Sequence, residues 1–439
     1  MKLANRLIEK LGEAEMVQRL GRLEAFNGLV IESIGPDARL GELCELMPCD
    51  GREAIQAEVV GFRQGRVLLM PYGNVHGISP GSRIRATGRA LRVPVGDALL
   101  GRVVDAFGRP LDAKGELHLS KHYPLHREPI NPLERAAISD VLETGIRGVD
   151  GLLTMGVGQR MGVFAGSGVG KSTLLGMMAR HVRADVTVLA LVGERGREVG
   201  DFLSHALGED GLRRSVVIAA TADQPALVRT HAVHAAHAVA EYFRDQGKSV
   251  LLIVDSMTRF AMAQREIGLA TGEPPTFRGY TPSVFAQLPR LLERCGRLAR
   301  GGSISAIYSV LVEGDDMNEP VTDHMRAILD GHIVLTRELA ARGHLPAIDM
   351  LQSTSRLMGQ LASKDEQAVA REIKRLIATY ESSRDLIELG AHQRGVNPLL
   401  DTAVDRKPLL DAVLSQAPGE ATPRMETLGK LRRAMEATA

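Results

Sequence analysis

The sequence predicts an α/β protein with a parallel sheet, because continuous apolar runs alternate with helical segments through the middle of the chain. Strands that are apolar on both faces are typical of a parallel sheet covered by helices on both sides. In three places an acidic or glycine-rich segment follows such a run, which puts polar chemistry at one edge of the sheet. The runs span residues 161–164, 186–192, 216–219, 250–254 and 304–311.

The chain begins with charges and leucines at helical spacing. Leu3, Leu7, Leu11 and Leu20 predict an amphipathic helix over residues 1–22, which either packs on its own domain or docks a partner protein. The early charges leave no apolar stretch for a signal peptide, and no apolar run is long enough to span a bilayer. We therefore expect a cytoplasmic protein whose membrane contact is peripheral.

Two further domains flank the expected α/β core of residues 93–358. Short β runs separated by glycine and proline occupy residues 23–92 and predict a small barrel or sandwich. Residues 359–439 look helical, and Ser363 with Glu366 forms a capping box before an apolar helical pattern.

The overall composition argues against a nucleic-acid partner. Lysine and arginine number 54 against 53 acidic residues, so no broad basic face is expected. Aromatic residues make up only 3% of the chain, which weakens base stacking. Cys44 and Cys49 form either a redox or metal pair or, as we expect, free thiols in a reducing compartment.

The segment 165–172 predicts a phosphate-binding loop between a strand and a helix. Its glycines let backbone N–H groups surround phosphate oxygens at a helix N-terminus, although Ala165 stands where the strict pattern has glycine. Lys171 is expected to reach the β and γ phosphates of ATP, and the Ser172 hydroxyl to ligate Mg²⁺. The expected nucleotide-binding residues are Gly166, Ser167, Gly168, Val169, Gly170, Lys171, Ser172 and Thr173.

Two carboxylates follow neighbouring apolar runs. Asp255 ends the run 250–254 and is expected to support the magnesium ion. Glu194 follows the run 186–192 and is the best candidate to orient or deprotonate the attacking water. Glu194 could instead simply pair with Arg195 or Arg197.

Longer segments of the sequence, which include the phosphate loop and both carboxylates, resemble a known family of ATPases. One set of segments resembles the catalytic subunits of rotary ATPases: the P-loop and residues 193–198 and 255–260. A second set is more similar to the type III export ATPases, flagellar or injectisome: residues 95–105, 272–285 and 312–320. The resemblance implies an N-terminal β-barrel, a RecA-like ATPase core and a C-terminal helical domain, assembled as a homohexamer. It covers the chain from about Gly21 onward.

The resemblance also implies roles for three arginines. Arg195 and Arg259 line the site, and Arg356 matches the arginine finger that reaches the γ-phosphate held by a neighbouring subunit, although a surface salt bridge is the alternative. A chain with both Glu194 and Arg356 serves both sides of every interface, which favours a self-sufficient ring. One departure is Leu345, where many relatives have an aromatic residue that stacks on adenine.

The implied function is an ATP-hydrolysing motor that releases export substrates from chaperones at a membrane export gate. A regulatory protein would bind the N-terminal helix, and a central coiled-coil stalk would contact the acidic loop with Asp315, Asp316 and Glu319, unless that loop is merely solvated. A rotary synthase subunit is the nearest rival, against which residues 385–391 argue. An RNA-translocating hexamer and a non-catalytic ring are weaker alternatives. Flagellar use is slightly favoured over injectisome use.

Three histidines lie outside this scheme. His231, His234 and His237 are spaced so that they drift around one helix, and no carboxylate lies among them. We therefore expect packing histidines and no metal site.

Overall fold

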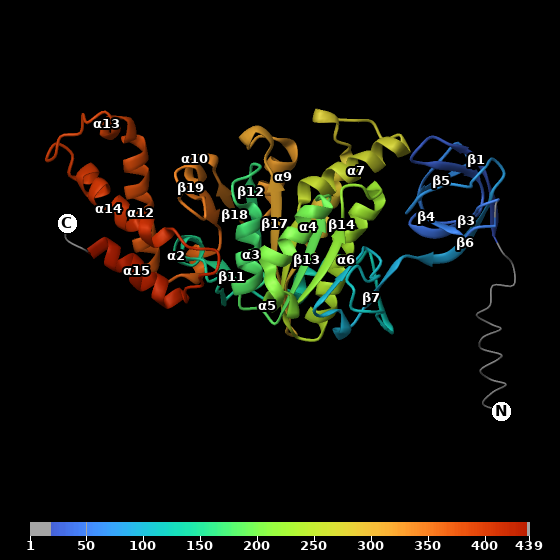
Figure 1. Cartoon of the computed structure of the whole chain (residues 1–439), viewed down its shortest axis with the longest axis horizontal. Coiled ribbons are helices and arrows are strands. Elements are labelled where there is room, and N and C mark those ends of the chain that lie inside the picture. The colour runs from blue at the N-terminus through green and yellow to red at the C-terminus, as the bar shows by residue number, and fades with distance from the viewer. Residues whose placement is uncertain (1–18, 50, 437–439) are drawn as a thin grey trace, which may run out of the picture.

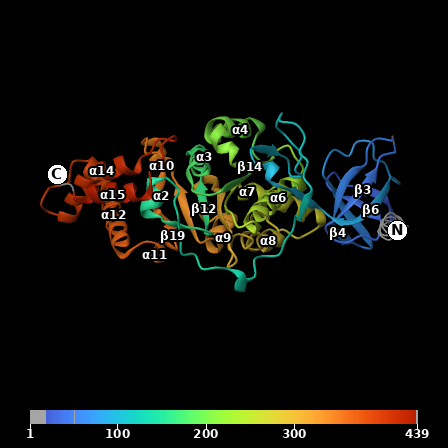
Figure 2. The same cartoon turned by 90° about the horizontal axis from the view of Figure 1, so that it is seen from below.

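The computed structural model describes residues 19–49 and 51–436, which form three parts arranged in a row along the long axis (Figures 1 and 2). A β-barrel lies at one end, an α/β core in the middle and a helical domain at the other end. The predicted fold class is confirmed. The expected N-terminal helix lies outside the described residues except for its last positions, where the expectation was wrong: residues 20–22 belong to a barrel strand.

The barrel is closed because its first strand pairs with both its second and its sixth. Inward-facing and outward-facing residues alternate along β3, and Cys44 and Leu46 point into a small apolar core with Leu69 and Ile84. The strand order is β1-β2-β5-β4-β3-β6. The strands are β1 (Leu20–Phe26), β2 (Ile31–Ile34), β3 (Glu42–Met47), β4 (Ile55–Arg63), β5 (Arg66–Pro71) and β6 (Arg83–Ala90).

The core is built on one large sheet whose main path runs β19-β18-β12-β17-β15-β13-β14-β8, with β16 pairing β17. The five runs predicted from sequence are the five consecutive central strands, and all of them pair in parallel. The sheet strands are β8 (Arg102–Val104), β12 (Arg160–Ala165), β13 (Val186–Val192), β14 (Ser215–Ala220), β15 (Ser249–Asp255), β16 (Gly296–Arg297), β17 (Ser303–Leu311), β18 (Gly331–Leu335) and β19 (Ile348–Ser355). Edge strand β19 runs antiparallel to β18.

Helices cover both faces of this sheet. Along β13, Val188 and Ala190 pack in the same apolar cluster as helix α6, whereas Leu189 and Leu191 pack in the cluster that contains helix α3. The core helices are α2 (Arg147–Leu152), α3 (Lys171–His181), α4 (Gly196–Asp201), α5 (Gly208–Arg213), α6 (Ala226–Asp245), α7 (Met257–Thr271), α8 (Pro282–Leu292), α9 (Pro320–Ile328) and α10 (Arg337–Ala341). Small two-stranded sheets are formed by β7 (Arg92–Val95) with β9 (Lys121–Pro124) and by β10 (Val141–Leu142) with β11 (Met155–Gly156).

The C-terminal part is helical, as expected. Helix α12 begins with the predicted capping box of Ser363 and Glu366 and buries Ile373 and Leu376 on its inner face. The last helix packs against α2 of the core, which anchors the domain. The helices are α11 (Met358–Leu361), α12 (Lys364–Ser382), α13 (Arg384–Glu388), α14 (Pro398–Leu414) and α15 (Arg424–Glu436).

Candidate active site

The phosphate loop connects β12 to α3 at the carboxyl edge of the sheet. Gly168 and Gly170 have φ angles of 80° and 92°, a left-handed conformation that side chains other than glycine rarely adopt. A glycine-rich turn of this kind before a helix lets backbone N–H groups face an anion, which the N-terminus of helix α3 also favours. Ser172 and Thr173 are exposed in its first turn.

Lys171 lies between two carboxylates. Its ammonium group forms a close ion pair with Asp255, and it lies 3.7 Å from Oε1 of Glu194. Asp255 ends strand β15, is buried, and also accepts a hydrogen bond of 2.6 Å from the hydroxyl of Ser309. The structure therefore brings together the three residues that the sequence placed at the ends of three different segments.

Glu194 has an unusual environment for a carboxylate. Burial raises its pKa to about 7, the negative charge of Asp255 and a hydrogen bond with Glu198 add to the rise, and Lys171 and Arg259 act in the opposite direction. Its Oε1 atom is buried and has no hydrogen-bond partner among the described residues. Such a group, placed beside a phosphate loop, is suited to accepting a proton.

The alternative role for Glu194 is not supported. Arg195 and Arg197 form their ion pairs with Glu198 and Asp201, at 3.8 Å each, and both arginines are largely exposed. Arg195 still lines the cleft.

Arg259 reaches the site by close packing against the backbone. A Cβ atom on Gly193, which has φ 70°, would lie 2.8 Å from Cβ of Arg259. Only glycine at this position lets helix α7 approach the end of β13 so closely. The Nε atom of Arg259 is buried without a hydrogen-bond partner in the described part of the chain.

These residues surround an open cleft of about 900 Å³ lined by the phosphate loop, Glu194, Arg195 and Arg259. A smaller cavity of about 60 Å³ adjoins it and is lined by Ser172, Glu194 and Asp255, among others. The smaller cavity has a hydroxyl and carboxylates as polar lining, the oxygen donors that Mg²⁺ prefers. The residues present therefore fit a triphosphate in the large cleft and a magnesium ion beside it.

Sequence reasoning missed Arg337, Glu198 and Ser309. Arg337 begins helix α10 directly after strand β18, lines the cleft, and lies 3.3 Å from Asp315. Recognising β18 as a strand would have placed Arg337 at the ligand-binding edge of the sheet. Glu198 stands within a string that the resemblance used, but nothing local to it indicates contact with Glu194.

Three expected residues line neither the cleft nor the smaller cavity beside it. Val169 of the phosphate loop is buried in the apolar cluster that contains helix α3. Arg356 follows β19, is exposed, and donates a hydrogen bond of 3.3 Å to the carbonyl of Arg326. Leu345 is 48% exposed, and its carbonyl accepts a hydrogen bond from the backbone of Gln416. Their assignments to the nucleotide site stay predictions.

The sheet, the phosphate loop and the paired carboxylates define a RecA-like P-loop nucleotide hydrolase. Family models agree: residues 145–355 match the ATP synthase alpha/beta family, nucleotide-binding domain, residues 25–88 its beta-barrel domain, and residues 362–433 the T3SS EscN ATPase C-terminal domain. The chain is 50% identical over 427 residues, 97% of each chain, to the flagellum-specific ATP synthase of Bacillus subtilis.

Solved structures give the same result. The assembled ATPase EscN of the enteropathogenic E. coli type III secretion system matches with a TM-score of 0.90 and 44% identity, over 94% of this chain and 100% of that one. EscN in complex with its central stalk EscO matches with a TM-score of 0.86 and 43% identity, with the same coverage. The chain thus belongs to the ATPases of type III protein export, flagellar or injectisome, and it hydrolyses ATP as a motor of that export.

The C-terminal domain matches the model of the export family. This match favours the export ATPase over the rotary synthase subunit, the nearest alternative that the sequence left open. Among the described residues, no helix is both long and apolar enough to cross a membrane.

Proposed function

We propose that each hydrolytic site is completed by two copies of the chain in a homohexamer. One copy supplies the phosphate loop, Glu194 and Asp255, and the next supplies Arg356. Within a single chain Arg356 is absent from the lining of the cleft, so it can act as an arginine finger only from a neighbour. The assembled relative supports a ring in which every copy has both halves of the site.

The chemistry follows from the charges in the cleft. Lys171, now paired with Asp255, turns toward the phosphates when ATP enters, and Glu194 accepts a proton from the attacking water through its unpartnered Oε1 atom. Mg²⁺ would be held by Ser172 and Asp255 and would neutralise phosphate charge. Arg356 from the neighbour stabilises charge on the γ-phosphate, an effect worth roughly 10³–10⁵ in rate.

The buried Oε1 atom of Glu194, which accepts no hydrogen bond within the described ranges, carries the proposal for hydrolysis. The absence of Arg356 from the cleft of its own chain carries the proposal of a shared site, which mixed rings test. Chains with Glu194→Gln and chains with Arg356→Ala are each expected to be inactive. A one-to-one mixture should regain activity, because about a quarter of the interfaces join an intact Glu194 to an intact Arg356. The matched control mixes Glu194→Gln with Lys171→Ala, which damage the same side of the interface, and should stay inactive. A Glu194→Gln and Arg356→Ala mixture as inactive as its parents would refute the shared site.

We also propose that a coiled-coil stalk contacts the acidic loop of Asp315, Asp316 and Glu319. The contact is made through Asp315 and Asp316, because Glu319 is buried and caps helix α9. Asp316 pairs with Arg278 at 2.7 Å, and Asp315 pairs with the cleft residue Arg337, so this loop joins a possible stalk surface to the nucleotide site. The relative solved with its central stalk supports this role. Charge reversal at Asp316 should abolish stimulation of the ATPase by the stalk protein and leave the basal rate intact. Undiminished stimulation would argue against the contact.

The remaining partners follow from the resemblance to the export family. We place the ring in the cytoplasm at the inner-membrane export apparatus, with export substrates, their chaperones and the export gate as partners, and a regulatory protein at residues 1–22. Deleting residues 1–18 should abolish co-purification with the regulatory protein and preserve ATP hydrolysis. Retained co-purification would place that partner elsewhere.

A further inference from the structure

Three side chains from distant segments meet where the barrel contacts the core. Glu58 lies on β4, His126 follows β9, and His231 lies on α6. One nitrogen or oxygen atom from each lies within 4.8 Å of the other two. Nε2 of His231 is 3.0 Å from Oε2 of Glu58, and both residues are buried. The carboxylate that was absent from the sequence around His231 is thus supplied by another domain.

A cavity adjoins this cluster. Its volume is about 330 Å³, and its lining includes Glu58, His126 and His231 together with His234 and Gln264. The space accommodates an ion with further water ligands, which open metal sites retain. A fully packed interface would exclude them.

Neighbouring groups hold the ligands in place. The Tyr72 hydroxyl donates a 2.6 Å hydrogen bond to Oε2 of Glu58. The rings of His126 and His234 meet edge to face with their centroids 4.4 Å apart. Such supporting contacts fix the orientation of metal ligands in proteins.

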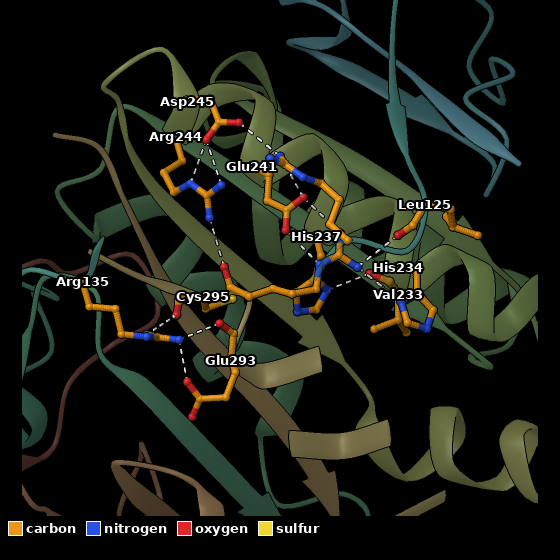
Figure 3. A network of polar contacts seen from close by, with 12 residues as sticks. Leu125, Arg135, Val233, His234, His237, Glu241, Arg244, Asp245, Glu293 and Cys295 are labelled. Atoms are coloured by element: carbon orange, nitrogen blue, oxygen red, sulfur yellow. Dashed lines mark hydrogen bonds and ion pairs between the residues drawn. The ribbon is translucent and has the colours of Figure 1, made fainter. Parts of the chain in front are cut away.

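The nearby positive charge of Arg294 is already compensated. Glu241 accepts hydrogen bonds from Arg294 of 2.8 and 3.1 Å, and a further contact of 3.3 Å joins Arg294 to Nδ1 of His234 (Figure 3). Because Glu241 balances the charge of Arg294, a cation bound by Glu58 and His126 is not repelled by an uncompensated positive charge.

We propose that Glu58, His126 and His231 form a binding site for a divalent transition-metal ion, with zinc the ion that the donor set favours. Two imidazole nitrogens and one carboxylate oxygen with an open fourth position are a common zinc environment, whereas Mg²⁺ and Ca²⁺ prefer oxygen. When Nε2 of His231 binds the ion, the proton that this nitrogen directs at Glu58 moves to Nδ1, which has no hydrogen-bond partner among the described residues. The ion joins the barrel, the segment after β9 and the core at one point, and the proposal is independent of the mechanism at the nucleotide cleft.

Metal titration of the full chain tests this site. The protein, without nucleotide or affinity tag, is freed of metal with a chelator and titrated with Zn²⁺ by calorimetry and with Co²⁺ by visible absorption. We expect one ion per chain and the intense Co²⁺ bands of a four-coordinate site. His126→Asn and Glu58→Gln should each weaken binding by at least about tenfold. The matched control is His122→Asn, an exposed histidine four positions before His126, which should leave binding unchanged.

Thermal unfolding provides a second measurement. Zinc should raise the unfolding midpoint of the wild-type chain and of His122→Asn, but not that of His126→Asn, because an ion that binds the folded state stabilises it. His126 is exposed, so its replacement leaves the fold intact. Absence of stoichiometric binding overturns the proposal. The proposal is also overturned if both His126→Asn and Glu58→Gln keep the wild-type affinity for the metal. It is overturned as well if His122→Asn loses as much affinity as these two variants.

Discussion

The core contains two clusters of buried charged residues, one extensively hydrogen-bonded and one with polar atoms that lack a hydrogen bond. Around Arg294, which is 2% exposed, Glu241, His234 and the carbonyl of Leu125 all contact the guanidinium group (Figure 3). In the nucleotide cleft, by contrast, Oε1 of Glu194 and Nε of Arg259 are buried without a hydrogen-bond partner within the described ranges.

This difference in hydrogen bonding indicates that the Arg294 cluster has a structural role and the cleft a functional one. A buried polar network in which the members satisfy one another rigidifies the fold. A buried polar atom that lacks a hydrogen bond reduces stability, and folds keep such atoms where a ligand or a reaction uses them. The Arg294 network therefore holds helix α6 to Leu125, directly after β9, and to the segment after α8, while the cleft is prepared for a ligand.

The largest expected effect lies in the cleft. Glu194→Gln keeps the size of the side chain and removes its basicity, so kcat for ATP hydrolysis should fall by about 10²–10⁴. Nucleotide binding, measured with a fluorescent ATP analogue, should persist.

The free energy of unfolding of Glu194→Gln should equal or exceed that of the wild-type chain, because the substitution removes a buried charge. A marked loss of stability would mean that Glu194 has a structural role. It would contradict the contrast between the Arg294 network and the nucleotide cleft.

The opposite outcome is expected for the satisfied network. Glu241→Gln leaves Arg294 buried without its counter-charge, which should reduce the free energy of unfolding by about 3–5 kcal/mol in urea denaturation. The control is Glu388→Gln, which breaks the exposed pair with Arg384 and should cost less than about 1 kcal/mol. Equal effects of the two substitutions would mean that burial does not distinguish these pairs.

The smallest expected effect is a pH dependence. Folding raises the pKa of Glu194 from 4.5 to about 7, so the folded chain holds this proton more tightly than the unfolded chain. The resulting stabilisation is complete below about pH 4.5 and is lost as the pH rises through about 7. Glutamine cannot ionise, so the stability advantage of Glu194→Gln over wild type should grow from about pH 5 to about pH 8, by on the order of 1 kcal/mol. A difference independent of pH, in nucleotide-free protein, would contradict the assigned pKa.

Local patterns predicted most of the fold. The five central strands are long and apolar, and the capping box of α12 is a short-range hydrogen-bond pattern, so both are visible in the sequence. Strand β8 has only three residues, β19 is an edge strand, and β18 lies next to it near the edge of the sheet, where the apolar signal is weaker. The first three residues of strand β1 were wrongly included in a helix because Leu20 also fits the helical spacing of the leucines before it.

The sequence by itself determined the phosphate loop and the two carboxylates, because a glycine-rich turn and an acid at a strand end are encoded by neighbouring residues. Only the tertiary structure decided that Lys171 lies between Asp255 and Glu194, that Arg337 lines the cleft, and that Glu58 meets His126 and His231. Such meetings depend on how separate elements pack, and packing joins residues whose local sequence patterns are independent of each other.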